Sequence, residues 1–457
     1  MMNKNMPLFG TNGIRGVFGK DLSLDFLVNI SRSLAAYYKK GPILIGRDGR
    51  NSNNIMFNIV TAALNSDGLD TVDAGILPTP CLQYATKRIE FNGGIMITAS
   101  HNPPEYNGLK PIANDGVELP RQDESVVEQI FKNKTFITSE IVGQNFKEEM
   151  IIDRYIDDVL ALVDVDRIKK RKFNVTMDLG NGVQALVAPL LAKKLGCTVI
   201  TVNGTIDGDF PGRGSEPTPS NLSLMSFVAK ETNSDIGAAF DGDGDRSIFC
   251  DEKGIVSWGD KTGTLLAKYL ILTKHPKAKI VCPVNTTHIL TKVAQDNGSE
   301  IIHTKVGSVE VSREMVKQGA IIGMEENGGF MYGVLNQVRD GALTTALMLD
   351  LMASEEKSLS AILSSLPKVY QYKSKFECTE MGLIQKVVDS AKNHGSPMKI
   401  ETLDGVKIWF DEESWLMLRP SGTEPLIRIY GESTDELLIN SKVNEYTRLV
   451  KECLDEN

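Results

Sequence analysis

Residues 280–303, IVCPVNTTHILTKVAQDNGSEIIH, contain the unit from which most of the chain is built. The apolar run over 280–282 predicts a strand, and the spacing of apolar residues over 287–295 predicts a helix. Gly298 ends this helix, and a second apolar run over 300–303 predicts another strand. This order of elements is that of a βαβ crossover, in which a helix joins two parallel strands.

The same order of elements occurs twice more along the chain, in units of roughly 30 residues. The strand, helix and second strand are predicted over 42–46, 54–64 and 69–75 in one copy, and over 173–177, 185–195 and 197–202 in the other. The copies share little sequence identity, so the inference depends on the order of the elements. Three such units predict three consecutive α/β domains with mixed, mainly parallel sheets, whose ligands bind beyond the carboxyl ends of the strands.

The order of elements changes after residue 368. The remaining chain predicts a strand from residue 370, a helix over 382–392, strands over 406–410 and 414–418, and a helix over 436–453. This pattern is typical of a smaller α+β domain. Residues 132–150 are polar, and we expect them to form a connection. The four predicted domains span residues 1–150, 151–255, 256–368 and 369–457.

The composition argues against several classes of protein. The chain has 457 residues, 41% of them hydrophobic, which suffices for several cores. Its net charge of −9 gives no general basic surface for nucleic acid, and no apolar run is long enough to span a membrane. Residues 1–16 lack the apolar block of a signal peptide, and the six cysteines are scattered without a C-x-x-C pair. We therefore expect a cytoplasmic protein with reduced thiols that binds neither nucleic acid nor membrane.

Residues 98–104, TASHNPP, follow an apolar strand predicted over 94–97. Proline lacks the backbone donor and pushes the preceding residue out of the helical region, so the chain continues as neither strand nor helix. The hydroxyl of Ser100 is therefore presented from a stiff loop. An ordinary Asn-Pro turn also explains this stretch when it is taken alone.

The strongest local signal is the stretch DGDGDR at residues 241–246, directly after an apolar strand over 236–240. Three carboxylates at alternate positions can turn onto one hard cation such as Mg²⁺ or Ca²⁺, and without a cation they would repel one another. An EF-hand is excluded because Arg246 stands where its sixth position requires glycine, and because a strand precedes the loop. A phosphatase that uses Asp241 or Asp243 as its nucleophile stays open.

Two further loops carry groups that suit a phosphorylated sugar. Residues 325–329, EENGG, offer acceptors and an amide, which suit vicinal hydroxyls. In residues 419–428, RPSGTEPLIR, the hydroxyls of Ser421 and Thr423 and the amides around Gly422 suit a phosphate nest flanked by arginines. Each stretch alone also fits a simple polar turn. Together, the loops predict phosphoryl transfer on a phosphorylated small molecule.

These motifs together resemble the α-D-phosphohexomutase superfamily, which includes phosphoglucomutase, phosphomannomutase and phosphoglucosamine mutase. The likeness covers essentially the whole chain, because four motifs stand in the family's order: T-A-S-H-N-P at 98–103, D-G-D-G-D-R at 241–246, a sugar loop at 325–329 and R-P-S-G-T-E-P at 419–425. The sugar loop E-E-N-G-G is typical of archaeal members. Gly329 replaces a histidine of bacterial members and Met324 replaces a usual glycine; both bear on sugar specificity and not on the chemistry.

The resemblance implies four domains around one central cleft, and it assigns roles to individual residues. Ser100 would carry a phosphoryl group and, together with Asp241, Asp243 and Asp245, would hold one Mg²⁺. Arg15 (which lies among three glycines), His101 and Lys110 match positions beside the phosphoserine. The residues expected to bind the substrate are Arg246, Lys305, Gly307, Glu325, Asn327, Gly328, Arg419, Ser421, Gly422, Thr423 and Arg428.

The implied reaction interconverts the 6-phosphate and 1-phosphate of a hexose or hexosamine. The phosphoserine gives its phosphoryl group to the substrate, and the bound 1,6-bisphosphate, which also serves as activator, turns over and returns its other phosphate to Ser100. Lys110 or His101 would take the proton of the attacking hydroxyl. Lys110 is preferred because nearby like charge would disfavour its ammonium. The fourth domain is expected to close over the intermediate and exclude water.

A metal-dependent sugar phosphatase and a non-catalytic phosphosugar sensor are the alternatives to a mutase. The sequence does not decide among glucosamine, glucose and mannose phosphates, because hexosamine and hexose differ at C2 by one small group and discrimination depends on side-chain placement. It also does not decide between a monomer and a homodimer.

Overall fold

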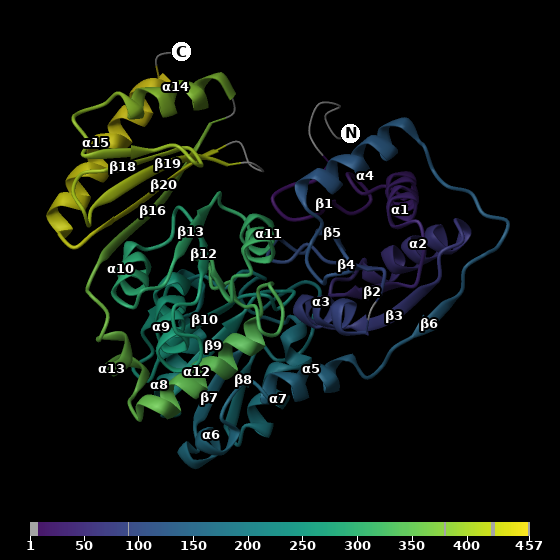
Figure 1. The fold of residues 1–457 in the computed structure, drawn as a ribbon, viewed down its shortest axis with the longest axis horizontal. Helices are drawn as coiled ribbons and strands as arrows, with labels where there is room; N and C mark the ends of the chain where they lie inside the picture. Colours follow the sequence, from purple (N-terminus) through teal and green to yellow (C-terminus); the bar gives the residue numbers. More distant parts are fainter. Residues whose placement is uncertain (1–7, 90, 379–380, 422–425, 456–457) are drawn as a thin grey trace.

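The computed structural model describes residues 8–89, 91–378, 381–421 and 426–455. Four sheets follow one another along the chain (Figure 1). The first has the order β1-β5-β4-β2-β3-β6, with strands β1 Ile14–Val17, β2 Ile43–Arg47, β3 Thr71–Ile76, β4 Gly93–Ile97, β5 Tyr106–Ile112 and β6 Asn145–Lys147. Its helices are α1 Leu24–Tyr38, α2 Asn53–Ser66, α3 Thr79–Arg88 and α4 Arg121–Asn133.

The second sheet has the order β11-β10-β9-β7-β8. Its strands are β7 Asn174–Asp178, β8 Thr198–Val202, β9 Ile236–Phe240, β10 Ser247–Asp251 and β11 Val256–Ser257. The helical elements are α5 Ile151–Leu160, α6 Val165–Arg171, η1 Val183–Leu186, α7 Ala188–Lys194, η2 Pro219–Asn221 and α8 Ser223–Glu231. Strand β11 pairs with β10, so the second sheet extends two residues past the boundary expected at residue 255.

The third sheet has the order β13-β12-β14-β15, and the fourth has the order β16-β20-β19-β18-β17. The third domain contains β12 Ile280–Pro283, β13 Ile301–Thr304, β14 Ile322–Met324, β15 Phe330–Tyr332, α9 Gly259–Thr273, α10 His288–Asp296, α11 Ser308–Gln318, α12 Gly341–Glu355 and α13 Leu359–Leu363. The fourth contains β16 Tyr370–Glu377, β17 Lys399–Glu401, β18 Val406–Trp409, β19 Trp415–Pro420, β20 Leu426–Ser433, α14 Met381–Lys392 and α15 Glu436–Asp455.

The first three sheets repeat one arrangement of strands. In each, a central strand (β2, β7 or β12) pairs in parallel with two neighbours, and the second neighbour pairs with an antiparallel strand. The loop before that antiparallel strand carries TASHNPP in the first sheet, DGDGDR in the second and EENGG in the third. The repeat therefore places three of the four motifs at equivalent positions, each after a buried strand.

The cores separate the fourth domain from the other three. One large apolar cluster runs from Leu44 in the first sheet to Leu366 after α13, and it includes most of α12, whose residues are buried all around the helix. The fourth domain has its own core around Leu416 and Ile429, under α14 and α15. In Figure 1 the fourth sheet, at the yellow end of the chain, lies beside the third. The fold class predicted from the repeats is confirmed: three mixed, mainly parallel sheets precede an antiparallel one.

Two sequence predictions need correction. Residues 132–150 contain β6, which pairs in parallel with β3; this edge strand is short and fully exposed, so it carries no alternation of apolar residues. The helix predicted over 185–195 is a 3₁₀ turn followed by α7. Pro189 lies in the first turn of α7, where its missing donor is tolerated.

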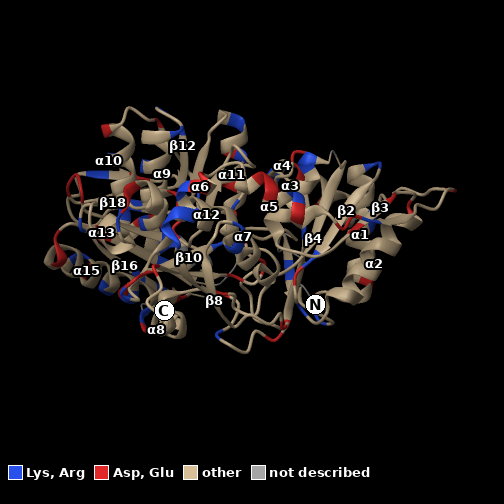
Figure 2. Cartoon of the chain, turned by 90° about the horizontal axis from the view of Figure 1, so that it is seen from below, with Lys and Arg blue, Asp and Glu red and all other residues tan. Residues whose placement is uncertain are grey.

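Lys and Arg are mixed with Asp and Glu over all four domains (Figure 2). Among the described residues, no helix combines the length and the apolar composition needed to cross a membrane.

Candidate active site

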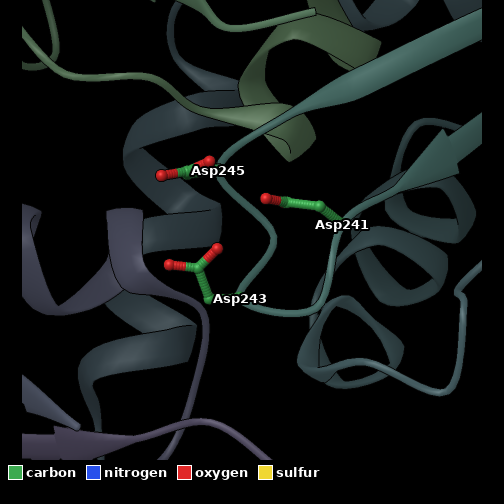
Figure 3. A group of neighbouring side chains, drawn as sticks. All are labelled: Asp241, Asp243 and Asp245. Carbon is green, nitrogen blue, oxygen red and sulfur yellow. The ribbon is translucent and has the colours of Figure 1, made fainter. Parts of the chain in front are cut away.

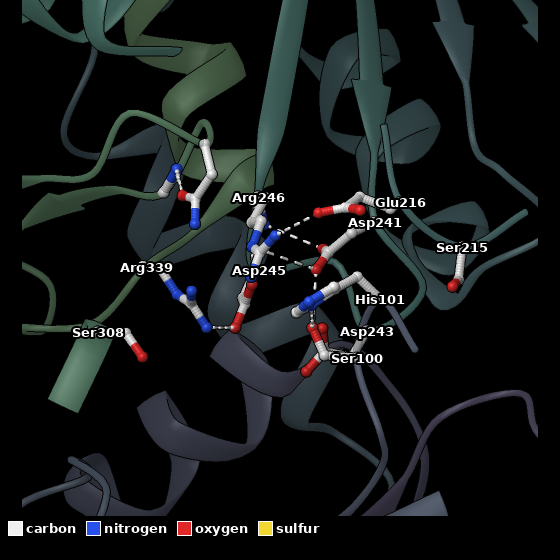
Figure 4. Close-up of polar contacts among 12 residues, drawn as sticks. Ser100, His101, Ser215, Glu216, Asp241, Asp243, Asp245, Arg246, Ser308 and Arg339 are labelled. Atoms are coloured by element: carbon white, nitrogen blue, oxygen red, sulfur yellow. Dashed lines mark hydrogen bonds and ion pairs between the residues drawn. The ribbon is translucent and has the colours of Figure 1, made fainter. Parts of the chain in front are cut away.

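Ser100 lies in the loop between β4 and β5 and is fully buried. Its backbone has φ 51°, in the left-handed region, which costs a serine about 1–3 kcal/mol. The Ser100 amide donates to Thr98 Oγ1 at 2.8 Å, which holds this turn. The Ser100 hydroxyl donates to Asp241 Oδ2 at 3.0 Å and lies 3.4 Å from His101 Nδ1 (Figure 4). The strained turn thus aims the hydroxyl at the carboxylate loop of the second domain.

Arg50, which the sequence did not single out, organises the Ser100 loop from behind. Its guanidinium is buried and pairs with Asp48 at 3.2 Å, and Asp48 also accepts a hydrogen bond from Thr98 Oγ1 at 2.6 Å. The same guanidinium donates to four loop carbonyls, those of Ser100, Asn102, Pro103 and Tyr106, at 2.6–2.8 Å. A rigid fork of donors can satisfy this many acceptors, whereas a lysine cannot.

We expect Arg50→Met to lower the free energy of unfolding by about 3–5 kcal/mol, because it leaves the buried Asp48 carboxylate unpaired. Any activity that depends on the Ser100 hydroxyl should fall as well, since the Ser100 turn loses its support. Urea unfolding and an activity assay measure the two effects. Arg47→Met is the matched control: Arg47 lies three residues before Arg50 and pairs with Asp73 of β3, and among the described residues no hydrogen bond or ion pair joins its side chain to the Ser100 loop. Equal urea midpoints for Arg50→Met and the wild type would contradict this role.

Asp241, Asp243 and Asp245 lie together in the loop between β9 and β10 (Figure 3). All three are buried, and their ligand oxygens lie within 4.8 Å of one another. Within the described chain, the Oδ1 atoms of Asp243 and Asp245 are buried without a hydrogen-bond partner. Burial, followed by the charges of Asp245 and Asp243, raises the pKa of Asp241 well above its ordinary value. The three carboxylates repel one another when they are ionised, and two of their oxygens lack hydrogen-bond partners among the described residues. A hard divalent cation would neutralise the charge and bind these oxygens, so the donor set fits Mg²⁺.

Lys110 joins two of these carboxylates. Its ammonium lies 3.0 Å from Asp243 Oδ2 and 3.3 Å from Asp245 Oδ2. Burial opposes the charged form, but Asp243 and Asp245 outweigh it and raise the pKa of Lys110 above its ordinary value. The sequence-based expectation was that like charge disfavours this ammonium, whereas its nearest charged neighbours in the described chain are carboxylates from the second domain.

Three arginines surround the Ser100 and aspartate loops. Arg246 Nε lies 3.8 Å from Asp241 and 3.9 Å from Asp245. Arg15 donates to Asn102 Oδ1 in the Ser100 loop at 2.7 Å, and burial lowers its pKa to about 10. Burial, and then Arg246, Arg15 and Arg339, lower the pKa of His101 well below its ordinary value. The site therefore concentrates positive charge around a neutral imidazole, which suits phosphoryl groups.

Arg339 links the aspartate loop to the loop at residues 325–329, which we call the sugar loop. It donates to Asp245 Oδ2 at 2.5 Å and to Glu325 Oε2 at 3.1 Å. The sequence did not reveal this residue, because no local motif surrounds it. Gly328 has φ 88°, and a Cβ there would lie 2.3 Å from the Ser247 carbonyl, so the loop requires glycine at this position.

The fourth domain brings Arg419 to the third domain. A single carboxylate oxygen of Asp404 accepts from Arg419 Nε at 2.6 Å and from the Val306 amide at 2.9 Å. Lys305 and Arg419 line one cavity of about 380 Å³, together with residues of the N-terminal segment such as Thr11. Gly307 follows Val306 at the start of α11.

The predicted phosphate loop is described only in part. Ser421 donates its amide to the Leu426 carbonyl at 2.9 Å, and Arg428 lies in β20. Gly422 and Thr423 lie outside the described residues.

Four family models match the chain in order. The models for domains I, II and III of phosphoglucomutase/phosphomannomutase, each described as alpha/beta/alpha, match residues 6–138, 153–254 and 258–370, and the model for the C-terminal domain matches residues 374–447. A phosphoglucosamine/phosphogalactosamine mutase of Sulfurisphaera tokodaii is 39% identical over 452 residues, which cover 97% of this chain and 99% of that protein. A phosphoglucomutase/phosphomannomutase of Thermococcus kodakarensis is 38% identical and covers 98% of both chains.

The solved structures show the same relationship. A phosphoglucomutase/phosphomannomutase family protein of Burkholderia thailandensis aligns with a TM-score of 0.88 and 26% identity over 98% of both chains. The chain therefore belongs to the phosphoglucomutase/phosphomannomutase family. It is a phosphohexomutase, an enzyme of the isomerase class, and these relatives give no support to the phosphatase alternative.

Proposed function

We propose that the enzyme interconverts the 6-phosphate and 1-phosphate of a hexose or hexosamine through a phosphorylated Ser100 and a bound 1,6-bisphosphate. The observation that carries this proposal is the buried Ser100 hydroxyl, which a left-handed turn holds 3.0 Å from Asp241. A serine that serves only packing needs neither the strain nor the carboxylate. The names of the two archaeal relatives support glucosamine, galactosamine, glucose and mannose phosphates as substrates to test.

One Mg²⁺ per chain would be held by Asp241, Asp243, Asp245 and the seryl phosphate, where it would neutralise charge on the phosphoryl group. Arg15 contacts the Ser100 loop and Arg246 lies close to Asp241, so both would bind oxygens of the phosphoryl group during its transfer.

His101 has a stronger claim than Lys110 as the base that takes the proton of the attacking hydroxyl. The low pKa of His101 leaves its imidazole neutral, so a nitrogen lone pair is available near Ser100. Lys110 is charged between Asp243 and Asp245, and its role is then to hold the carboxylates in place.

The substrate is proposed to lie between Ser100 and the third and fourth domains. Sugar hydroxyls would contact the sugar loop through Glu325, Asn327 and Gly328, and the phosphate that is not reacting would meet the fourth domain. Its expected ligands are Lys305, Gly307, Arg419, Ser421, Gly422, Thr423 and Arg428. The cavity shared by Lys305 and Arg419 supports this placement.

We further propose the domain boundaries 1–150, 151–255, 256–368 and 369–457, with β11 at 256–257 adding to the edge of the second sheet, and a cytoplasmic location. The six cysteines support reduced thiols, since all are buried and no disulfide joins them in the described chain.

The proposal is tested with the 1-phosphates of glucosamine, galactosamine, N-acetylglucosamine, glucose and mannose, each supplied with Mg²⁺ and a trace of the matching 1,6-bisphosphate. We expect at least one of them to be converted to its 6-phosphate without stoichiometric release of inorganic phosphate. Release of one phosphate per substrate consumed would indicate hydrolysis, and tight binding without turnover would indicate a sensor.

A further inference from the structure

A charged pair joins the back of the sugar loop to the fourth domain. Glu326, the second residue of the loop, forms an ion pair with the ammonium of Lys373 in β16. That ammonium also lies 3.8 Å from the ring centroid of Trp258, at the start of α9. The side chains are only 16% and 21% exposed, so the pair is largely removed from water.

Lys373 faces the third domain because of the alternation of side chains along β16. Tyr370, Tyr372 and Phe376 pack against the core of the fourth domain. Gln371 and Lys373 therefore lie on the opposite face. Gln371 confirms this direction, since its amide donates to Asp260 in the first turn of α9 at 2.8 Å.

The strand that carries Lys373 also leads to the phosphate loop. Strand β16 is antiparallel to β20, with Lys373 opposite Tyr430 and Lys375 opposite Arg428. Strand β20 begins at Leu426, within the motif at residues 419–428. A displacement of β16 would therefore carry the start of β20, including Arg428, with it, because the ladder between two strands is stiff.

Consecutive residues of the sugar loop are held by different domains. Glu325 pairs with Arg339, which also pairs with Asp245 of the second domain, whereas Glu326 pairs with Lys373 of the fourth. An ion pair taken out of water adds little net stability compared with apolar residues of similar size. A contribution to the stability of the fold therefore explains the pair poorly. The position that the pair gives the sugar loop relative to the fourth domain explains it better.

We propose that Glu326 and Lys373 are positioning residues that set the separation between the sugar loop and the end of β20 that carries Arg428, in the arrangement of the domains that this structure shows. The sugar loop and the phosphate loop can then bind the hydroxyls and the non-reacting phosphate of one substrate at the same time. This inference rests on the proposed roles of these two loops. Neither residue touches the substrate; both act through their neighbours.

The test is Lys373→Met, assayed with the best hexose phosphate found above. We expect KM to rise about 10-fold or more with a smaller change in kcat, because the sugar loop and the phosphate loop no longer lie at the separation that one substrate requires. The inhibition constant of inorganic phosphate should stay within about twofold, since that ion needs only the phosphate loop. Lys373→Arg should restore most of the affinity, because it keeps the charge and the stacking on Trp258.

Lys407→Met is the matched control. Lys407 belongs to the same sheet and also reaches the third domain, where it donates to the Val284 carbonyl at 2.7 Å. Among the described residues, no hydrogen bond or ion pair joins it to the sugar loop or to the phosphate loop. A KM rise in Lys373→Met that clearly exceeds that in Lys407→Met supports the proposal. Equal KM values in the two variants, or a parallel rise in the phosphate inhibition constant, would overturn it.

Two further variants control for a folding defect in Lys373→Met and distinguish a failure of the positioning role from a failure of the proposed sugar loop. Glu326→Met combined with Lys373→Met restores apolar packing without the pair, so the higher KM should persist; recovery of the wild-type KM would overturn the inference. Asn327→Ala tests the sugar loop itself. A higher KM in Asn327→Ala but not in Lys373→Met would overturn the positioning role alone, whereas no effect of Asn327→Ala would overturn the sugar loop and this inference with it.

Discussion

Replacing Ser100 with alanine is expected to lower kcat of the mutase reaction on the order of 10⁴-fold or more, because the nucleophile is removed from a set of groups that act as a unit. The chemistry requires an oxygen that accepts a phosphoryl group and returns it. In the proposed function Ser100 supplies that oxygen, next to Asp241 of the aspartate loop and near Arg15 and Arg246. The loss should appear as a fall in kcat in an isomerisation assay with saturating substrate and Mg²⁺.

Ser215→Ala is the control for this experiment. The Ser215 hydroxyl donates to the Asn102 carbonyl of the same loop at 2.9 Å, so its loss tests the loop without the nucleophile. We expect less than about a tenfold effect, as for one ordinary hydrogen bond. Ser100→Gly suits the left-handed backbone, so it should fold as well as the wild type. Its activity should be as low as that of Ser100→Ala. Activity of Ser100→Ala within tenfold of the wild type would contradict the assignment.

The second large effect is expected for Asp243→Asn, which should lower kcat/KM by about 10³-fold. The substitution replaces a charged ligand with a neutral amide where Asp243 Oδ1 lies buried without a hydrogen-bond partner in the described chain. It also removes the negative charge that pairs with Lys110. The measurement is initial rate against Mg²⁺ concentration, in which the variant should need far more Mg²⁺ than the wild type.

Removing the metal should reproduce this defect. Wild-type enzyme treated with a chelator is expected to lose activity and to regain it when Mg²⁺ is restored. Asp73→Asn is the control carboxylate, since Asp73 pairs with Arg47 outside the proposed site. Full activity in excess chelator, or an unchanged Mg²⁺ requirement in Asp243→Asn, would be incompatible with a metal site in this loop.

Much of the fold was predictable because its signals are local. Apolar runs, a helical spacing and a glycine recur in one order, and the three repeated sheets follow that order. Strand β6 was not predictable, since three exposed residues at a sheet edge have no apolar pattern. The 3₁₀ turn before α7 could have been foreseen from Pro189, which cannot lie deep inside a helix.

The site was predictable where a motif follows a strand, and not where a single residue acts across domains. Ser100 and the three aspartates meet as their loops suggested. Arg50 and Arg339 reach the site from segments with no motif of their own. The charged state of Lys110 likewise depends on carboxylates of another domain, which the sequence near Lys110 does not show.

The path of the phosphorus atom tests the central claim most directly. The enzyme is labelled with ³²P on Ser100 and separated from unbound ³²P. It is then mixed with unlabelled hexose 6-phosphate in the presence of Mg²⁺. Label that leaves the protein and appears in the 1,6-bisphosphate and in product sugar phosphate during the first turnovers is the predicted result. Label that stays on Ser100 while the sugar phosphate is isomerised would contradict it.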